Sequence, residues 1–202
     1  MAKKTQNGYE RERRVVAQEA ARIIVNHGVR DYRVAKLKAA ERLGLSSRGS
    51  LPGNAEIEQA VAEHHQIFGG DVHADLLQTL RNTALSAMEM LAAFSPRLVG
   101  PVLNGTADDN SAINLHVFSD SAEAVSAALS SRDIACRPYE RRLKTRRGQQ
   151  DSYAGFEFRF GEAHVQATVF PVDGIRQAPL SPVDGKPMER ADERRVRELV
   201  AA

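Results

Sequence analysis

This sequence has little cysteine and no long apolar run, and each absence excludes a class of protein. Cys136 is the single cysteine in 202 residues. It excludes an intrachain disulfide and a cysteine-based zinc cluster, and it is typical of a reducing compartment. No segment is apolar over the length that a membrane span needs, and the first residues lack the apolar core of a secretory signal. We therefore expect a cytoplasmic protein that has no membrane partner.

An excess of charge of one sign is also missing. The chain has 28 Lys and Arg residues against 26 Asp and Glu residues, which gives a formal net charge of +2. A net charge this small provides no global attraction to polyanions, so any contact with nucleic acid or phosphate has to come from a local cluster. The densest basic cluster consists of Arg137, Arg141, Arg142, Lys144, Arg146 and Arg147.

This basic cluster has two interpretations. Arginine presents paired N–H donors that match phosphate oxygens, so the run favours a contact with phosphates. Charges on an edge strand also protect a sheet from pairing with other chains, and this role needs no ligand. The sequence leaves both interpretations open.

Signatures of other active sites are missing as well. No Gly-x-Ser-x-Gly elbow occurs, and Cys136 has no evident base beside it. Histidines and acids gather between residues 64 and 75, but they lack the His-x-x-x-His or His-Glu-x-x-His spacing that places two metal ligands on one helical turn. We expect surface or capping roles for these residues, and no metal site.

The first part of the chain favours helices. Apolar residues recur at helical spacing up to about residue 94, and glycines at positions 28, 44, 69 and 70 separate the segments. Asp31 and Asn54 are the expected N-caps of the second and third helices, and Asp71 that of the fourth. Phe68 falls on the apolar side of the third helix, which is predicted to end at Gly69.

The rest of the chain favours a sheet. In its second predicted strand, Ile113, Leu115 and Val117 point to one face, and Asn114 and His116 point to the other. Strands are predicted over residues 98–103, 112–118, 135–143, 153–160 and 164–170, with helices over 121–130 and 192–200.

Two connecting segments affect how this sheet is covered. The helix over 121–130 is predicted to pack through a small apolar face of Ala124, Ala127 and Ala128. The segment 173–188 is rich in proline and glycine, which excludes a regular element. We expect it to lie across the sheet as a loop and to bring Arg176 near the polar face.

These elements predict an α+β fold, with a helical region packed beside a small mixed sheet. Long parallel crossovers are missing apart from the helix over 121–130, which argues against a doubly wound fold. We predict a helical region over residues 1–70 and an α+β domain over residues 71–202.

Residues 98–118 contain two motifs in a familiar order. Asn104-Gly105-Thr106 follows the first predicted strand, and Ser111-Ala112-Ile113-Asn114-Leu115 opens the second. This order resembles the core of the nucleotidyltransferase superfamily of polymerase-β type, in which a strand ends in Gly-Ser and the next one begins with Ser-Asp-Ile-Asp-Leu. The resemblance spans roughly residues 76–171 and extends to bacterial nucleotidyltransferase-like proteins. It implies a mixed sheet of that type.

The carboxylates of that family are missing from this chain. Ala112 and Asn114 stand at the two positions of the acidic pair, and Gln166 falls near the position of the third acid. Divalent metals in such sites bridge carboxylates and nucleotide phosphates, so these replacements remove the anionic ligands. The resemblance therefore implies a catalytically degenerate protein, without catalytic residues, metal or cofactor, that binds a nucleotide, RNA or another phosphorylated ligand. The residues expected to bind that ligand are Gly105, Thr106, Asn114, His116, Gln166, Arg141, Arg142, Arg146, Arg147 and Arg176.

The first alternative is an active enzyme. Asp108, Asp109 and Asp120 lie in loops next to the predicted strands. If they hold Mg²⁺ as a cofactor, the chain is a metal-dependent nucleotidyltransferase with displaced carboxylates.

The second alternative is a DNA-binding or protein-interaction module in the N-terminal helices. The turn over residues 28–31 joins two predicted helices, which is typical of a helix-turn-helix. Basic residues surround that turn, at Arg33, Lys36, Lys38 and Arg42. The sequence does not specify the oligomeric state.

Overall fold

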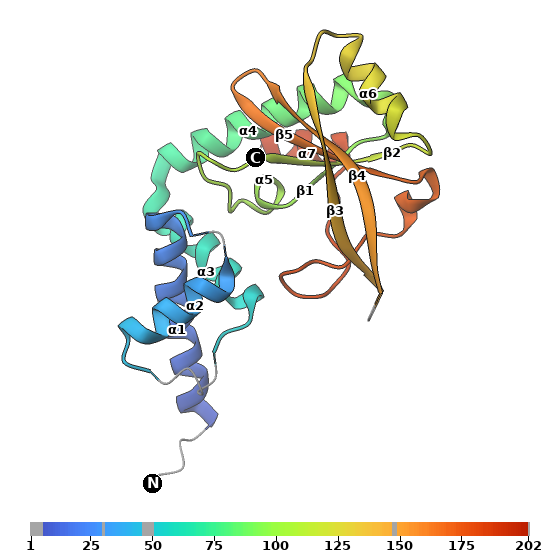
Figure 1. Cartoon of the computed structure of the whole chain (residues 1–202). Coiled ribbons are helices and arrows are strands. Elements are labelled where there is room, and N and C mark those ends of the chain that lie inside the picture. The colour runs from blue at the N-terminus through green and yellow to red at the C-terminus, as the bar shows by residue number, and fades with distance from the viewer. Residues whose placement is uncertain (1–5, 30, 46–50, 147–148, 202) are drawn as a thin grey trace. The chain divides into compact units, whose positions relative to one another are not determined.

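A computed structural model describes residues 6–29, 31–45, 51–146 and 149–201 (Figure 1). The chain divides into two compact units, Met1–His73 and Ala74–Ala202. The sequence placed this division at residue 70. No helix of the described segments combines the length and the apolar character that a membrane span requires.

Three helices form the core of the first unit: α1 (Gln6–His27), α2 (Tyr32–Arg42) and α3 (Asn54–His64). The predicted N-cap of α2 is confirmed, because Asp31 Oδ1 accepts a hydrogen bond from the Arg33 amide at 2.7 Å. Side chains from all three helices are buried together, including Ile23, Ala39 and Ile57.

The segment that follows α3 differs from the prediction. His65–Gly69 form a π-helix that leads directly into α4 (Gly70–Met90). The predicted interruption at Gly69 and Gly70 is nevertheless present, because Gly70 has a φ of 50° and a ψ of −151°, which lie outside the helical region. A π turn contains an extra residue and so rotates the side chains within it relative to those of α3. Phe68 is 72% exposed instead of being buried with the apolar residues of α3, and its ring centroid lies 4.8 Å from that of His64.

Two of the predicted helix caps are also corrected. Gly53, rather than Asn54, precedes α3, and the Gly53 amide donates to Glu56 Oε2 at 2.7 Å. The Asn54 side chain is engaged elsewhere, because its Oδ1 accepts from Lys36 Nζ at 2.9 Å. Asp71 lies in the first turn of α4 and not in front of it.

The second unit contains a five-stranded mixed sheet in the order β1-β2-β5-β4-β3 (Figure 1). β2 and β5 are parallel, and every other pair of neighbours is antiparallel. The α+β class predicted from the sequence is therefore confirmed. The strands are β1 (Arg97–Val99), β2 (Ile113–Phe118), β3 (Cys136–Arg146), β4 (Gln149–Phe160) and β5 (Ala163–Phe170).

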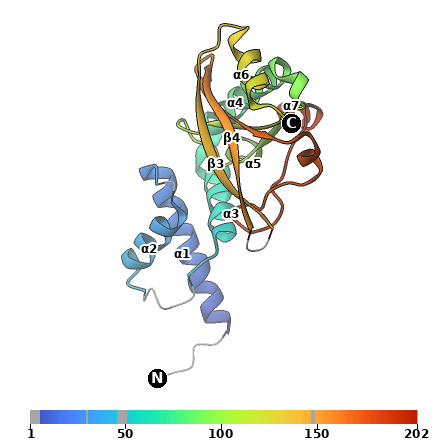
Figure 2. The same ribbon diagram turned by 45° about the vertical axis from the view of Figure 1, so that its right-hand side comes forward.

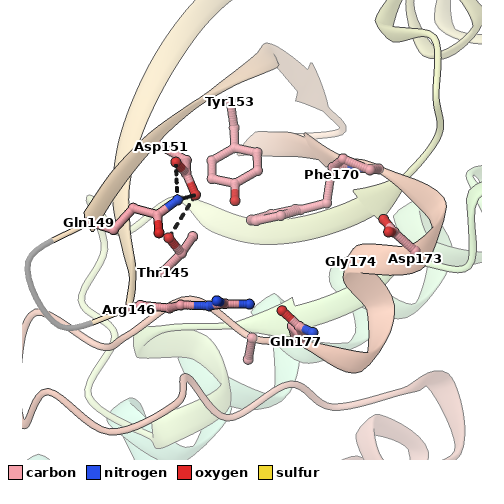
Figure 3. Close-up of a pocket in the computed structure, with 11 residues that line it drawn as sticks. Thr145, Arg146, Gln149, Asp151, Tyr153, Phe170, Asp173, Gly174 and Gln177 are labelled. Atoms are coloured by element: carbon pink, nitrogen blue, oxygen red, sulfur yellow. Dashed lines mark hydrogen bonds between the residues drawn. The ribbon is translucent and has the colours of Figure 1, made fainter.

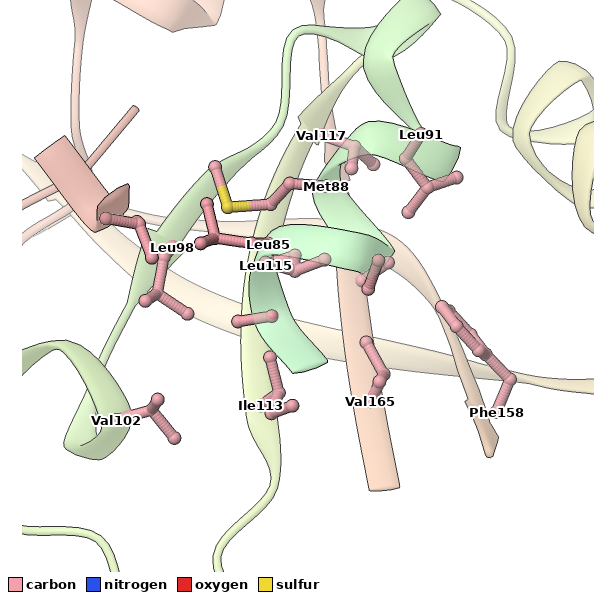
Figure 4. Close-up of a cluster of buried hydrophobic side chains, with 14 of the residues drawn as sticks. Leu85, Met88, Leu91, Leu98, Val102, Ile113, Leu115, Val117, Phe158 and Val165 are labelled. Atoms are coloured by element: carbon pink, nitrogen blue, oxygen red, sulfur yellow. The ribbon is translucent and has the colours of Figure 1, made fainter. Parts of the chain in front are cut away.

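One face of this sheet forms the hydrophobic core (Figure 4). The predicted alternation is confirmed, because Ile113, Leu115 and Val117 of β2 are fully buried on this face. They pack with Leu85 and Met88 of α4. Burying large apolar side chains of this kind contributes about 1.5–3 kcal/mol each, so this face holds the unit together. The core also contains residues of α6 (Ala122–Ser130) and α7 (Glu193–Ala201).

The apolar face of α6 is not the predicted one. Val125 and Leu129 are buried, whereas Ala124 and Ala127 are exposed. Residues four apart lie on the same side of a helix, and the larger pair removes more apolar area from water than the alanines do. The sheet therefore selects the valine–leucine side of this helix.

Two strand boundaries are corrected as well. β1 ends at Val99, because Gly100 has a φ of 76° and the next residue, Pro101, starts the short helix α5 (Pro101–Asn104). At the other end of the sheet, β4 begins at Gln149, in the segment that the sequence predicted as a loop.

Candidate functional site

The polar face of the sheet lies opposite the helices and is the candidate site. The parallel pairing of β2 with β5 sets Asn114 beside Gln166 and His116 beside Thr168. Residues directly paired in neighbouring strands point to the same face. The structure thus brings together Asn114 and Gln166, which the sequence had placed at two of the three carboxylate positions of the resembled family.

A guanidinium group lies between these two amides. Arg141, from β3, donates to Gln166 Oε1 at 2.6 Å and to Asn114 Oδ1 at 3.5 Å. The Asn114 amide is oriented for this contact, because its Nδ2 donates to the Ala112 carbonyl at 3.1 Å. A cation therefore occupies the place where the resembled family has acids.

Tyr139 keeps Arg141 in this position. The Arg141 Cζ lies 5.4 Å from the centroid of the Tyr139 ring, close enough for a cation–π contact. The ring crosses over Gly155 of β4, where a Cβ atom would approach the Tyr139 Cζ to 2.3 Å. The Tyr139 hydroxyl is 2.7 Å from Thr168 Oγ1. The missing side chain of Gly155 thus makes room for the ring that supports Arg141.

His116 lies under a second arginine and is only 1% exposed. Arg190 Nε donates to His116 Nδ1 at 3.0 Å, and Arg190 Nη1 donates to the Gly174 carbonyl at 2.8 Å. The guanidinium stacks on the rings of Phe170 and Phe118, at 4.9 and 5.1 Å from their centroids. Because Nδ1 accepts a hydrogen bond, the neutral imidazole carries its proton on Nε2. His116 therefore accepts a hydrogen bond from Arg190 and is too buried to contact an outside ligand.

The burial of His116 beneath Arg190 determines the charge state of both side chains. Burial lowers the pKa of His116 to about 3, and the positive charges of Arg190 and Arg141 act in the same direction. Burial also lowers the pKa of Arg190 to about 10, which still leaves it protonated at neutral pH. The pair thus consists of a neutral histidine and a charged arginine.

Arginines without an acidic partner gather here. The charges of Arg190 and Arg141 both lower the pKa of His116. The pKa of Arg190 is itself lowered mainly by burial, and the charge of Arg97 adds to that effect. Over the described ranges, no carboxylate lies within ion-pair distance of these three arginines or of Arg146. The polar face therefore carries arginines that have no ion-pair partner among the described residues, whereas its acid Glu157, the cross-strand partner of Gln166, pairs with Arg137 at 3.7 Å.

A cavity of about 300 Å³ adjoins this face (Figure 3). The ring of Tyr153 stacks on that of Phe170 with centroids 4.4 Å apart, and its hydroxyl points into the cavity. Arg146 and Gln177 approach each other from opposite walls. Tyr153 is also the cross-strand partner of Arg141, so the cavity begins one side chain away from that guanidinium.

An ionised carboxylate forms part of the wall of this cavity. Asp151 accepts hydrogen bonds from Thr145 Oγ1 at 2.7 Å and from Gln149 Nε2 at 3.1 Å. Both hydrogen bonds lower the pKa of Asp151, and the bond from Thr145 has the larger effect. With Arg146 and Gln177 opposite, the cavity offers donors, an acceptor and an aromatic ring.

The other predicted ligand residues lie elsewhere or are occupied. The amides of Gly105 and Thr106 both donate to the Pro101 carbonyl, so they close α5 instead of facing a phosphate. Arg142 is exposed on the opposite side of β3 from Arg141, because successive side chains of a strand alternate. Arg176 is exposed at the end of the 3₁₀ segment η3 (Val172–Arg176). Arg147 lies outside the described residues.

Sequence reasoning missed several residues of this site. Alternation along β3 was a usable signal for Tyr139, which lies two residues before Arg141 and so shares its face. No signal pointed to Arg190, because it follows an irregular segment and meets His116 from 74 positions away.

The loop acids of the enzyme alternative have roles in turns. Asp108 accepts from Ser111 Oγ at 2.7 Å and from the Asn110 amide at 3.0 Å. Asp120 accepts from the Val172 amide at 3.0 Å. In the part of the chain that the structure describes, no three His, Cys, Asp or Glu side chains gather in a way that could hold a metal ion.

The basic residues near the first turn of the helical unit are partly used within it. Lys36 Nζ donates to the Pro52 carbonyl at 2.8 Å and to Asn54 Oδ1, and Arg42 pairs with Glu19 at 3.1 Å. Two of the cations that a helix-turn-helix would offer to DNA thus contribute to the packing of this unit.

Comparison of the chain with family models, with curated proteins and with solved structures finds no match to any of them.

Proposed function

We propose that the Ala74–Ala202 unit is a nucleotidyltransferase-like binding domain that holds a nucleotide or another phosphorylated small molecule and catalyses no transfer. The observation that carries this proposal is Arg141, which lies between the amides of Asn114 and Gln166 with no acidic partner in the described segments.

Phosphate is the ligand group that suits this arrangement. A guanidinium offers several N–H donors in one plane, and charge-assisted bonds to phosphate oxygens are about twice as strong as neutral ones. Arg97 and Arg190 add to the positive potential around His116. The cavity lined by Tyr153 and Phe170 then receives the remainder of the ligand.

The same arrangement argues against catalysis. Nucleotidyl transfer requires metal ions that hold the triphosphate in line with the acceptor, and Mg²⁺ prefers anionic oxygen ligands. Asn114 and Gln166 supply neutral oxygens that Arg141 already uses, and the charge of Arg141 repels a second cation. Binding a phosphate in the ground state does not by itself accelerate its transfer.

Replacing Arg141 by Met is expected to weaken phosphate binding by tenfold or more. One lost charge-assisted contact is worth about 1.5–3 kcal/mol, and 1.4 kcal/mol corresponds to a factor of ten. Isothermal titration with inorganic tripolyphosphate and with the four nucleoside triphosphates measures this change. We expect binding in EDTA and weaker binding in excess Mg²⁺, because the metal neutralises the phosphates.

The matched control for this experiment is Arg159→Met. Arg159 is an exposed arginine of β4 that pairs with Glu162 and lies six positions from Tyr153, the cross-strand partner of Arg141, so its replacement changes the net charge equally without removing a contact of Arg141. Equal binding by the Arg141→Met variant and by wild type would contradict the proposal. So would binding that requires Mg²⁺.

We also expect no transfer of labelled nucleotide to protein, RNA or small acceptors with Mg²⁺ or Mn²⁺. The reason is that Asp108 and Asp120 hold turns together, while Glu157, the acid beside Gln166 on the polar face, pairs with Arg137 and His164 and offers one carboxylate rather than a cluster. A triple Asp108→Ala, Asp109→Ala, Asp120→Ala variant is the control. Labelling by wild type that disappears in this variant would establish the active-enzyme alternative.

A further inference from the structure

Part of the β3–β4 hairpin projects beyond the rest of the sheet. β4 pairs with β5 only from Gly155 onward, whereas β3 and β4 stay paired as far as Arg146 and Gln149. Figures 1 and 2 show the two strands running together as a long twisted pair. We call residues 140–146 and 149–154 the ribbon. It is two strands wide, because β5 does not accompany it.

The two faces of the ribbon differ. The inward face lines the cavity together with the segment after β5, whose Leu180 amide also donates to the Lys144 carbonyl at 2.6 Å. On the outward face, Arg142 pairs across the strands with Ser152, and Lys144 pairs with Gln150. All four of these side chains are exposed.

The outward cations are not engaged by the protein. The side chains of Arg142 and Lys144 make no hydrogen bond or ion pair with any described residue. The single acid on that face, Glu140, accepts a hydrogen bond from Ser152 Oγ. Both cations can therefore contact an external anion.

The ribbon also concentrates the charge of the protein. It contains four of the 28 basic residues and two of the 26 acidic residues of the chain, so it carries a net charge of +2 while the rest of the chain has a net charge of zero. Protection of an edge strand explains charge on β3. It does not explain why the whole positive excess lies in the part of the hairpin that extends past its neighbour.

We propose that the outward face of the ribbon binds duplex DNA in the major groove. That groove is about 12 Å wide and admits a two-stranded ribbon, whose strands lie about 4.8 Å apart. Arg142 and Lys144 then reach phosphates, and the Gln150 amide faces base edges. The major groove of A-form RNA is too deep and narrow for this fit. The surface is separate from the proposed phosphate site, because Arg141 points to the other face.

The test is fluorescence anisotropy of the full chain with a labelled 20-base-pair DNA duplex over a range of salt concentrations. Each phosphate contact contributes about 0.9 to the slope of log affinity against log salt. The double variant Arg142→Gln, Lys144→Gln is therefore expected to have a slope shallower by about 1.8. Its affinity at 50 mM salt is expected to fall at least tenfold.

The control is the double variant Arg132→Gln, Arg159→Gln, which removes two exposed arginines outside the ribbon. It changes the net charge equally and is expected to keep wild-type affinity within about twofold. Equal losses in both double variants would show that only net charge matters and would overturn the proposal. Failure of the wild type to bind duplex DNA, or a preference for RNA duplexes or single strands, would overturn it too. Far-ultraviolet circular dichroism verifies that each variant is folded.

Discussion

Between pH 6.5 and pH 4.5 the sheet of the Ala74–Ala202 unit is expected to lose roughly 2–3 kcal/mol of stability. The pKa of His116 is about 3 in the folded protein, below the ordinary value of 6.5. In this pH window the unfolded chain binds a proton that the folded chain does not, so stability falls as the pH falls. Each pH unit below 6.5 removes about 1.4 kcal/mol, until the folded pKa is reached.

The carboxylates with lowered pKa values in this unit contribute little to the change in stability between pH 6.5 and pH 4.5. Hydrogen bonds lower the pKa of Asp151, so the stability that this carboxylate contributes is lost only below its ordinary value of 3.8. The same direction holds for Glu123, whose pKa is lowered by hydrogen bonds from its own amide and from Ser121. The loss between pH 6.5 and 4.5 therefore reports His116.

Hydrogen exchange of the amides in β2 and β5, corrected for the intrinsic pH dependence of exchange, measures this effect. It reports the sheet separately from the helical unit, which need not unfold with it. The control is His116→Asn, whose Oδ1 offers Arg190 an acceptor but does not titrate. We expect the variant to lose most of the pH dependence. An unchanged acid sensitivity would show that the buried imidazole is not its cause.

Replacing Arg190 by Met is expected to destabilise the same unit by about 2–3 kcal/mol. Met keeps much of the apolar contact with Phe118 and Phe170 but leaves the His116 Nδ1 and Gly174 carbonyl acceptors without their donor. A buried acceptor without a partner costs about 1–3 kcal/mol, and the lost cation–π contacts add to this. Part of the loss is offset, because Arg190 Nη2 is itself buried without a partner.

Arg190→Lys is the matched variant for this prediction. Lysine keeps the positive charge but replaces the planar set of donors by one ammonium group, so we expect an intermediate loss of stability. Hydrogen exchange over residues 171–190 is expected to rise more in the Met variant than in the Lys variant. Wild-type protection of this segment in both variants would mean that the Arg190 contacts do not hold it against the sheet.

Local patterns in the sequence predicted much of the second unit. Alternation in β2 identified Ile113, Leu115 and Val117 as core residues, because the side chains of a strand alternate between two faces. The helix predicted over residues 121–130 is present as α6, which Ser121 caps by accepting from the Ala124 amide. These features depend on residues within a few positions of each other, which is the range over which a sequence pattern is informative.

Predictions failed where a local signal had two outcomes. Asn54 is a good N-cap residue in isolation, yet Gly53 precedes α3 and the Asn54 side chain accepts from Lys36 instead. The apolar residues 98–103 were predicted as one strand, but Pro101 starts a helix there. In α6, small and large apolar side chains lie on different sides, and packing against the sheet decided between them.

The sequence by itself determined the α+β composition, the inward face of each central strand and the absence of acids at positions 112, 114 and 166. Only the tertiary structure decided that β5 lies between β2 and β4, which brings Gln166 beside Asn114 and within reach of Arg141. It also separated Arg141 from Arg142 and placed Arg190 over His116. The reason is that strand order follows from burying the apolar faces of the whole unit together, and no short stretch of sequence contains that information.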